Sequence, residues 1–373
     1  MKKRCVFLIL PLLLIFLSGF DSDSANIIEK QLETAENSGI TEGLSERTKD
    51  TLEEIGISGI KIDFLENLSF SDIFDLLKSG FIKQIKEPVY AMAAIIASGI
   101  ICAAAECFYD EFSQSKNLIN AVSAISAASC ILLPMKNVIS FSGEVINECS
   151  DFIFSFVPVY SYAVTSAGYI SSAVGFRSLM LGASAVISNL ANEIVVPLIC
   201  IYFALCIAGS VSDLNIEKIA KSVKSFAVWV LTLSVTVFSG IMGLGTIVSS
   251  SADGAFSKTA KFLIGSSIPV AGSVVSDALS TLKGCMVVAK NLLGVYAIVV
   301  IAAIFLPPII SLVCWRICLS FSEGINSVLG NKNLSGILSS ASCVMGIMLA
   351  LVSLVAVMFI FSITIMLLTA GGI

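Results

Sequence analysis

Long apolar stretches separated by short polar segments dominate the sequence from Pro88 onward. A helix needs about 20 mostly apolar residues to cross a bilayer. Six stretches meet this requirement clearly: Tyr90 to Tyr109, Leu118 to Ile139, Glu193 to Val211, Phe226 to Val248, Leu292 to Val313 and Cys343 to Thr369. The pattern therefore predicts an all-α fold, a polytopic transmembrane helical bundle.

Two further stretches have the right length but contain proline among many Ser and Gly residues. Phe152 to Ile170 contains Pro158, and Phe262 to Leu282 contains Pro269. Proline removes a helical hydrogen bond and weakens insertion into the membrane, so broken or re-entrant helices are predicted here. The span count is six or eight, because the basic residues of the loops fit both arrangements equally.

The N-terminus has the pattern of a secretory signal. Lys2, Lys3 and Arg4 precede the apolar stretch from Cys5 to Phe20, and a polar segment follows up to Ala25. We interpret residues 1–25 as a signal peptide or, since Asp23 weakens the cleavage site, as an uncleaved anchor. In both cases the following segment is expected outside the cytoplasm.

Residues 26–87 differ from the rest of the chain. Acidic and basic residues come first, and apolar residues then follow at helical spacing, as at Phe70, Phe74, Leu77 and Phe81. The pattern predicts short amphipathic helices that bury little core by themselves. We therefore expect this extracytoplasmic segment to dock on the membrane domain, residues 88–373, or on a partner.

The prolines indicate a faint internal repeat. Pro158 and Pro197 are related to Pro269 and Pro308 by a shift of 111 residues. The repeat units would be residues 152–245 and 262–359. With eight spans each unit holds three, so the two units would be inverted with respect to the membrane, as in many transporters and channels. Pro158, Pro197 and Pro308 would then mark related kinks.

The second proline segment is the best candidate for a functional element. A broken helix leaves backbone groups that lipid cannot satisfy, so it must face protein or water. Small residues allow close approach, and an acid in an apolar neighbourhood is unusual. The segment predicts a pore-lining or assembly hairpin, with a merely packed hairpin as the alternative. Its residues are Gly265, Ser266, Ser267, Pro269, Gly272 and Asp277.

Other charges near the apolar stretches are few. Glu193 begins its stretch, where an acid costs far less than at a helix centre, and we interpret it as a polar entrance residue or as a carboxylate without a task. A self-contained secondary transporter would need several buried charges on broken helices. Only Asp277, Glu193 and Arg177 are candidates, so this alternative has little support.

The composition agrees with a membrane protein. Apolar residues make up 56% of the 373 positions, and charged residues make up 13%, against about 25% in typical soluble domains. The formal net charge of −5 provides no basic footprint for nucleic acid. We therefore expect no binding to DNA or RNA.

The residue inventory also limits the chemistry. Histidine is absent, which removes the commonest general base and metal ligand. The eleven cysteines form no C-x-x-C pair, and the sequence has no GxxxxGK[ST] loop. A Ser–Lys intramembrane protease would need Lys283 or Lys290, which lie at segment ends. We expect a non-enzymatic protein without metal or cofactor.

A signal-like N-terminus, an acidic extracytoplasmic stretch and a polytopic half together resemble the stage III sporulation protein AE family. The most specific match is the block from 265 to 279, with its Ser-Ile-Pro-Val core and Val275-Ser-Asp-Ala-Leu279. The resemblance covers essentially the whole chain. It implies no established catalytic residues, in agreement with the missing histidine and phosphate-binding loop.

The resemblance further implies a role and a location. Members of this family are components of the channel-like complex that joins mother cell and forespore and supports late forespore development. The expected location is the mother-cell membrane around the forespore. The implied partners are other membrane proteins of that complex, including ring-forming subunits, a separate cytoplasmic ATPase and a forespore-side partner. A homo-oligomer is also compatible with the resemblance.

Overall fold

The computed structural model describes residues 22–36, 38–41, 43–54, 57, 70–108, 113–211, 216–267 and 272–369. Within these ranges all regular secondary structure is helical. The predicted all-α architecture is therefore confirmed. Residues 1–21 of the predicted signal segment lie outside the described residues.

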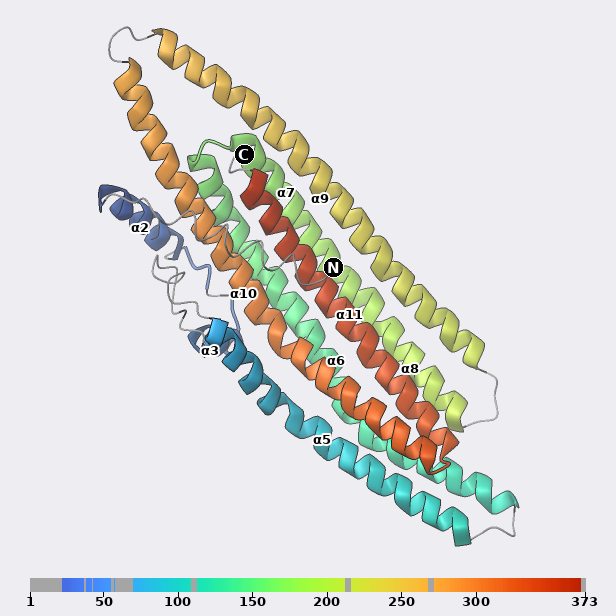
Figure 1. Cartoon of the computed structure of the whole chain (residues 1–373). Coiled ribbons are helices and arrows are strands. Elements are labelled where there is room, and N and C mark those ends of the chain that lie inside the picture. The colour runs from blue at the N-terminus through green and yellow to red at the C-terminus, as the bar shows by residue number, and fades with distance from the viewer. Residues whose placement is uncertain are drawn as a thin grey trace.

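Two short helices come first, and from Phe70 onward long helices follow one another closely along the chain (Figure 1). In chain order they are α2 (Ser22–Glu36), α3 (Glu46–Glu54), α5 (Phe70–Phe108), α6 (Ser113–Ser166), α7 (Ile170–Asn189), the π-helix η1 (Leu190–Val195), α8 (Val196–Val211), α9 (Glu217–Ser267), α10 (Gly272–Val328) and α11 (Lys332–Thr369).

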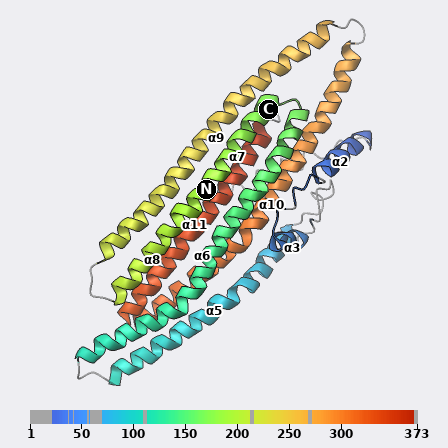
Figure 2. The same ribbon diagram turned by 180° about the vertical axis from the view of Figure 1, so that it is seen from behind.

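The long helices form one elongated bundle in which chain neighbours are antiparallel (Figure 1, Figure 2). The helices α7, η1 and α8 make a single column, α5 and α9 lie at opposite edges, and α10 and α11 lie inside. Gly168 and Gly330, with φ of 88° and 83°, provide the left-handed residue in the α6–α7 and α10–α11 turns. Glycine adopts this conformation without the steric cost of a Cβ atom.

The centre of the bundle is built from α10 and α11 with α6 against them. Trp315, Phe305 and Phe359 are almost completely buried there. On α6 the rings of Phe152, Phe156 and Tyr160 stack at centroid distances of 5.5 and 5.2 Å, and Tyr160 meets Phe176 of α7 edge to face at 5.6 Å; all four side chains are buried. Van der Waals packing of this kind holds helices together in lipid.

Five helical segments of the described part are long and apolar enough to cross a membrane. They are Lys78–Ala104, Ile170–Gly209, Lys218–Gly245, Thr281–Val328 and Lys332–Leu368. At about 1.5 Å per residue, the 57 residues of α10 extend about 85 Å, whereas the hydrocarbon layer is about 30 Å thick. The bundle is that of a multi-pass membrane protein, and its longest helices extend well beyond the hydrocarbon layer.

The two stretches predicted to be broken at a proline differ in outcome. The helix α6 continues through Pro134 and Pro158 to Ser166, so no break occurs at Pro158, and the stretch from Phe152 to Ile170 is interrupted only by the turn at 167–169. The buried aromatic stack around Pro158 holds this helix together despite the missing backbone donor. The chain does turn back within the second predicted segment, because α9 ends at Ser267 and α10 begins at Gly272.

The course of α9 also corrects the predicted inverted repeat. This helix runs without a turn from Glu217 to Ser267, so residues 226–248 and 262–267 share one direction. The chain therefore reverses twice between α8 and α10, and both run the same way along the bundle (Figure 1). The two proposed units have the same orientation and are not inverted, while the duplication itself stays a prediction.

The N-terminal segment packs along the outside of the bundle. The helices α2 and α3 lie against α10, and Figure 2 shows them on the same side of the bundle. The helix α5 begins at Phe70 and passes through Pro88, so it crosses the predicted boundary between residues 87 and 88 without interruption. The helices α2 and α3 are too short to bury a core of their own, and their docking on the long helices was expected for that reason.

Candidate functional site

The predicted hairpin lies at the turn between α9 and α10. Gly265, Ser266 and Ser267 end α9, and Gly272 begins α10. Pro269 lies outside the described residues, as do the side chains of the whole block including Asp277. Figure 1 shows that α9 and α10 project beyond the other helices at this end. The chain thus changes direction between Ser267 and Gly272, and the adjoining ends of α9 and α10 stand clear of the other helices.

The other predicted polar residues do not form one site with each other. Arg177 lies on α7 and Glu193 on η1, and both are exposed. They are separated by about four helical turns along the same column. Glu193 and Arg177 as possible polar entrance residues therefore stay a prediction, and the structure does not bring the two side chains together.

The two remaining prolines lie within helices. Pro308 is buried in α10 beside Pro307. Pro197 lies in the first turn of α8, directly after the π-helix η1. Its ring would clash with the carbonyl of Glu193 in a regular α-helix, and the wider π turn relieves this contact. The proline therefore explains a local widening and not a break.

A polar seam joins α6 to the α7–η1 column. Asn147 Oδ1 accepts hydrogen bonds from Ser188 Oγ at 2.6 Å and from Asn192 Nδ2 at 2.8 Å. One turn further along α6, the hydroxyls of Ser150 and Ser184 are 2.7 Å apart. Such bonds between helices stabilise their association where lipid offers no partner. The sequence did not predict this seam, because hydrophobic periodicity describes each helix by itself and does not show which residues of two helices meet.

A cleft of about 570 Å³ lies beside this seam. Its walls are the start of α3, one face of α6 and the middle of α10. Four carboxylates line it, and its one lining cation, Arg47, lies 4.8 Å from the centroid of the Phe141 ring. We call it the acidic cleft; its acids are Glu46, Glu144, Glu148 and Asp151.

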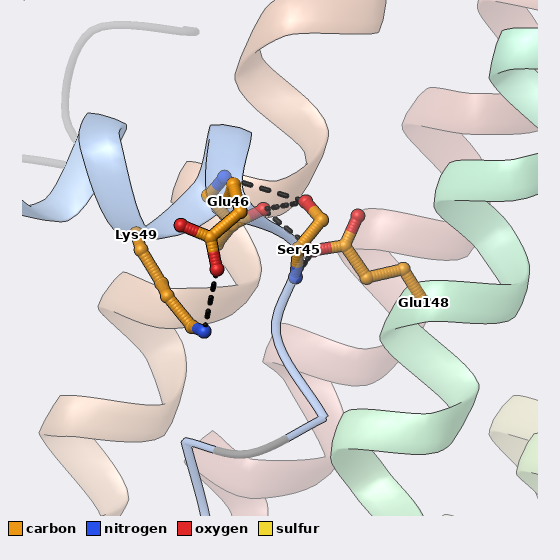
Figure 3. A network of polar contacts seen from close by, with 5 residues as sticks. Ser45, Glu46, Lys49 and Glu148 are labelled. Atoms are coloured by element: carbon orange, nitrogen blue, oxygen red, sulfur yellow. Dashed lines mark hydrogen bonds and ion pairs between the residues drawn. The ribbon is translucent and has the colours of Figure 1, made fainter.

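Glu148 ties the N-terminal segment to α6 at this cleft. Its Oε1 atom accepts hydrogen bonds from the Ser45 backbone N–H at 2.9 Å and from Thr48 Oγ1 at 2.6 Å, as Figure 3 shows for Ser45 and Glu148. An acid suits this place because the first N–H groups of α3 lack partners within the helix. Burial, and then the charge of Glu148, raise the pKa of the neighbouring Cys149 thiol, which therefore stays protonated.

A second group of charges surrounds the α6–α7 turn. The carboxylate of Asp253 on α9 accepts hydrogen bonds from the backbone N–H groups of Ser171 and Ser172, both at 2.7 Å. Lys283 and Lys290 of α10 place their ammonium groups 4.8 and 5.6 Å from the ring centroid of Tyr169. We call Tyr169, Asp253, Lys283 and Lys290 the turn cluster. Lys290 could have been predicted as a functional residue from the sequence, because it is a charged residue with apolar neighbours. Asp253 could not, because its neighbours in the sequence are polar.

The contacts of the described residues in the acidic cleft and the turn cluster are those of binding and packing. Among the described residues no group of three His, Cys, Asp or Glu side chains could hold a metal ion. Lys290 Nζ has no hydrogen-bond partner, so it forms no pair with a serine as a Ser–Lys protease would require. In the part of the chain that the structure describes, the acidic cleft and the turn cluster are therefore sites without an activated nucleophile.

The comparisons with known proteins agree with the sequence resemblance. The family model for stage III sporulation protein AE matches residues 61–370. Stage III sporulation protein AE of Bacillus subtilis (strain 168) is 24% identical over 285 residues, which cover 75% of this chain and 71% of that protein. No solved structure matches the chain. Since the matched range includes all five candidate spans, the chain belongs to the stage III sporulation protein AE family.

Proposed function

We propose that the chain is a non-enzymatic subunit of a channel or export complex that links mother cell and forespore. The observation that carries this proposal is the family match over residues 61–370, which covers the membrane bundle and not a detachable domain. Family membership already makes the chain a sporulation membrane protein. The lack of histidine and of an activated nucleophile among the described residues supports a structural or conducting role.

The proposed partners are the other membrane proteins of the same complex. Energy would come from a separate cytoplasmic ATPase, since the sequence contains no phosphate-binding loop of the GxxxxGK[ST] type. Ring-forming subunits and a forespore-side partner complete the proposed assembly. The adjoining ends of α9 and α10 support such contacts, because they project beyond the other helices (Figure 2).

The predicted extracytoplasmic position of the N-terminal segment favours one orientation of the bundle. The helix α5 leads from that segment to the end of the bundle that holds the α8–α9 and α10–α11 connections, with Lys218, Lys221, Lys224, Arg316 and Lys332. Charge alone does not decide, because the opposite end carries Lys258, Lys261, Lys283 and Lys290. With the N-terminal segment outside, the end with the α8–α9 connection would face the mother-cell cytoplasm. The docked helices α2 and α3 would face the space between the two membranes.

Deletion of the gene in its own host tests the proposal. We expect engulfment to finish and late forespore gene expression to fail, with a fluorescent fusion of the chain in the membrane around the forespore. The full-length chain, solubilised in mild detergent, should bring the other complex subunits with it. A self-contained secondary transporter would instead purify alone and would move its substrate in vesicles without any partner. Normal late forespore expression in the deletion strain would contradict the proposal.

A further inference from the structure

The turn cluster contains a buried cation without an acceptor. Lys290 is completely buried, and its Nζ atom has no hydrogen-bond partner. The ring of Tyr169 lies over this ammonium group, and Lys283 lies near the same ring and over Gly168 of the turn. Two positive charges therefore converge on one aromatic side chain at the end of α6. An uncompensated charge in such a place is costly and marks a functional site by default.

The acids of the described residues do not neutralise the two lysines. Asp253 is the acid of the turn cluster, and both of its oxygens accept backbone hydrogen bonds from the first turn of α7. Neither Lys283 nor Lys290 forms an ion pair with a described residue; the two pairs present, Lys49–Glu46 and Lys83–Glu54, lie in the N-terminal part. Further polar atoms of the same hairpin, Tyr160 OH and Ser172 Oγ, also lack partners. Among the described residues, the cluster thus has more positive charge than acids to pair with it.

The surface beside the turn cluster is apolar. Leu282 precedes Lys283 and is 45% exposed, and Ile170 follows Tyr169 and is 48% exposed. Val174, one turn further along α7, is 64% exposed. Cations beside exposed apolar side chains fit an anionic lipid, whose headgroup takes the charge while its acyl chains cover the apolar surface.

We propose that the turn cluster binds the phosphate group of an anionic phospholipid. Lys283, which is partly exposed, contacts the phosphate directly. Lys290 attracts it from the low-dielectric interior behind the Tyr169 ring, where its charge is screened little by water. The binding site is independent of what the complex conducts, and it would anchor the α6–α7 turn between the two projecting helices. A free phosphate ion has the same chemistry and is the alternative source.

Native mass spectrometry of the full-length chain tests the proposal. The purified protein is mixed with phosphatidylglycerol, phosphatidylcholine or inorganic phosphate, and bound lipid and the midpoint of thermal unfolding are measured. The variants are Lys290→Met and Lys283→Gln, and the matched control is Lys218→Gln at the opposite end of the bundle. We expect wild type to retain phosphatidylglycerol preferentially and to be stabilised by it. Each cluster variant should lose about fivefold in affinity, and the control should not change.

The two readouts separate binding from folding. Removing an unpaired buried charge should raise the unfolding midpoint of Lys290→Met without lipid, and phosphatidylglycerol at the same concentration should then stabilise this variant less than it stabilises wild type. Equal retention of both lipids by wild type would overturn the proposal, as would undiminished phosphatidylglycerol binding by Lys290→Met. Stabilisation by inorganic phosphate without lipid selectivity would overturn the lipid source and assign the cluster to a soluble ion.

Discussion

Single polar side chains fix several of the contacts between distant parts of this chain. Glu148 holds the start of α3 on α6, Asp253 holds the start of α7 on α9, and Asn147 joins α6 to η1. In each case a side chain satisfies backbone or amide groups that would otherwise be unpaired at a helix end or between helices. Loss of such a partner leaves a donor without an acceptor, which costs about 1–3 kcal/mol when the donor is buried.

Glu148→Ala should loosen the N-terminal segment. The change removes the acceptor for the Ser45 N–H and the Thr48 hydroxyl, and we expect a loss of about 1–2 kcal/mol in the docking of α3. Hydrogen exchange of the α3 amides should then become roughly 5–30 times faster. Glu144→Ala is the matched control, because Glu144 lines the same cleft but is exposed. Equal exchange in the two variants would show that Glu148 does not hold α3.

At the scale of elements, close backbone approach decides how α5 joins the bundle. The carbonyl of Gly99 on α5 accepts a hydrogen bond from Asn331 Nδ2 at 2.9 Å, and Asn331 follows the glycine of the α10–α11 turn. A Cβ atom at Gly99 would collide with the side chain of Asn326. One glycine thus allows an edge helix to contact the turn between the two central helices.

Gly99→Ala should therefore separate α5 from the α10–α11 turn. Asn326 is buried and cannot move away freely, so we expect a destabilisation of about 1–3 kcal/mol, seen as a lower midpoint of thermal unfolding in detergent. Gly240→Ala on α9 is the control, because a Cβ atom there meets nothing within 4 Å and should change stability by less than about 0.5 kcal/mol. If both variants unfold at the wild-type midpoint, the close contact at Gly99 is not required.

At the scale of the whole molecule, the direction of each long helix sets the sidedness of the bundle. The helices α8 and α9 meet at one end, and α9 and α10 meet at the other (Figure 1). Since α9 does not turn back between residues 217 and 267, Lys221 and Lys258 lie toward opposite ends. With the end that holds the α8–α9 connection in the cytoplasm, we predict six membrane crossings and not eight.

Single cysteines at positions 221 and 258 test this order in a chain from which the eleven native cysteines have been removed. A membrane-impermeant thiol reagent applied to intact cells should label position 258 and leave position 221 protected. A cysteine at position 267, at the end of α9, should be labelled like position 258. Labelling at 221 with protection at 258 would reverse the orientation and would require eight spans or an inserted N-terminus.

Hydropathy alone determined that this is an all-α membrane protein and placed most of its apolar helices. Long apolar stretches have few other stable structures in a bilayer, because every backbone group must find its partner within the segment. The turn near Pro269 was also predictable, since proline, glycine and serine disfavour a continuous helix there. The family resemblance depended on this same block and is confirmed over residues 61–370.

Tertiary structure decided which helices continue, how they are oriented and which charges meet. Packing of the aromatic stack carries α6 through Pro158, although local propensity favours a break. The unbroken course of α9 gives the two proposed repeat units one direction, which the proline spacing could not reveal. Lys283 and Lys290 converge on Tyr169 across more than a hundred residues of sequence. Periodicity reports only the neighbours of a residue along the chain, whereas these contacts arise from the packing of helices that are remote in sequence.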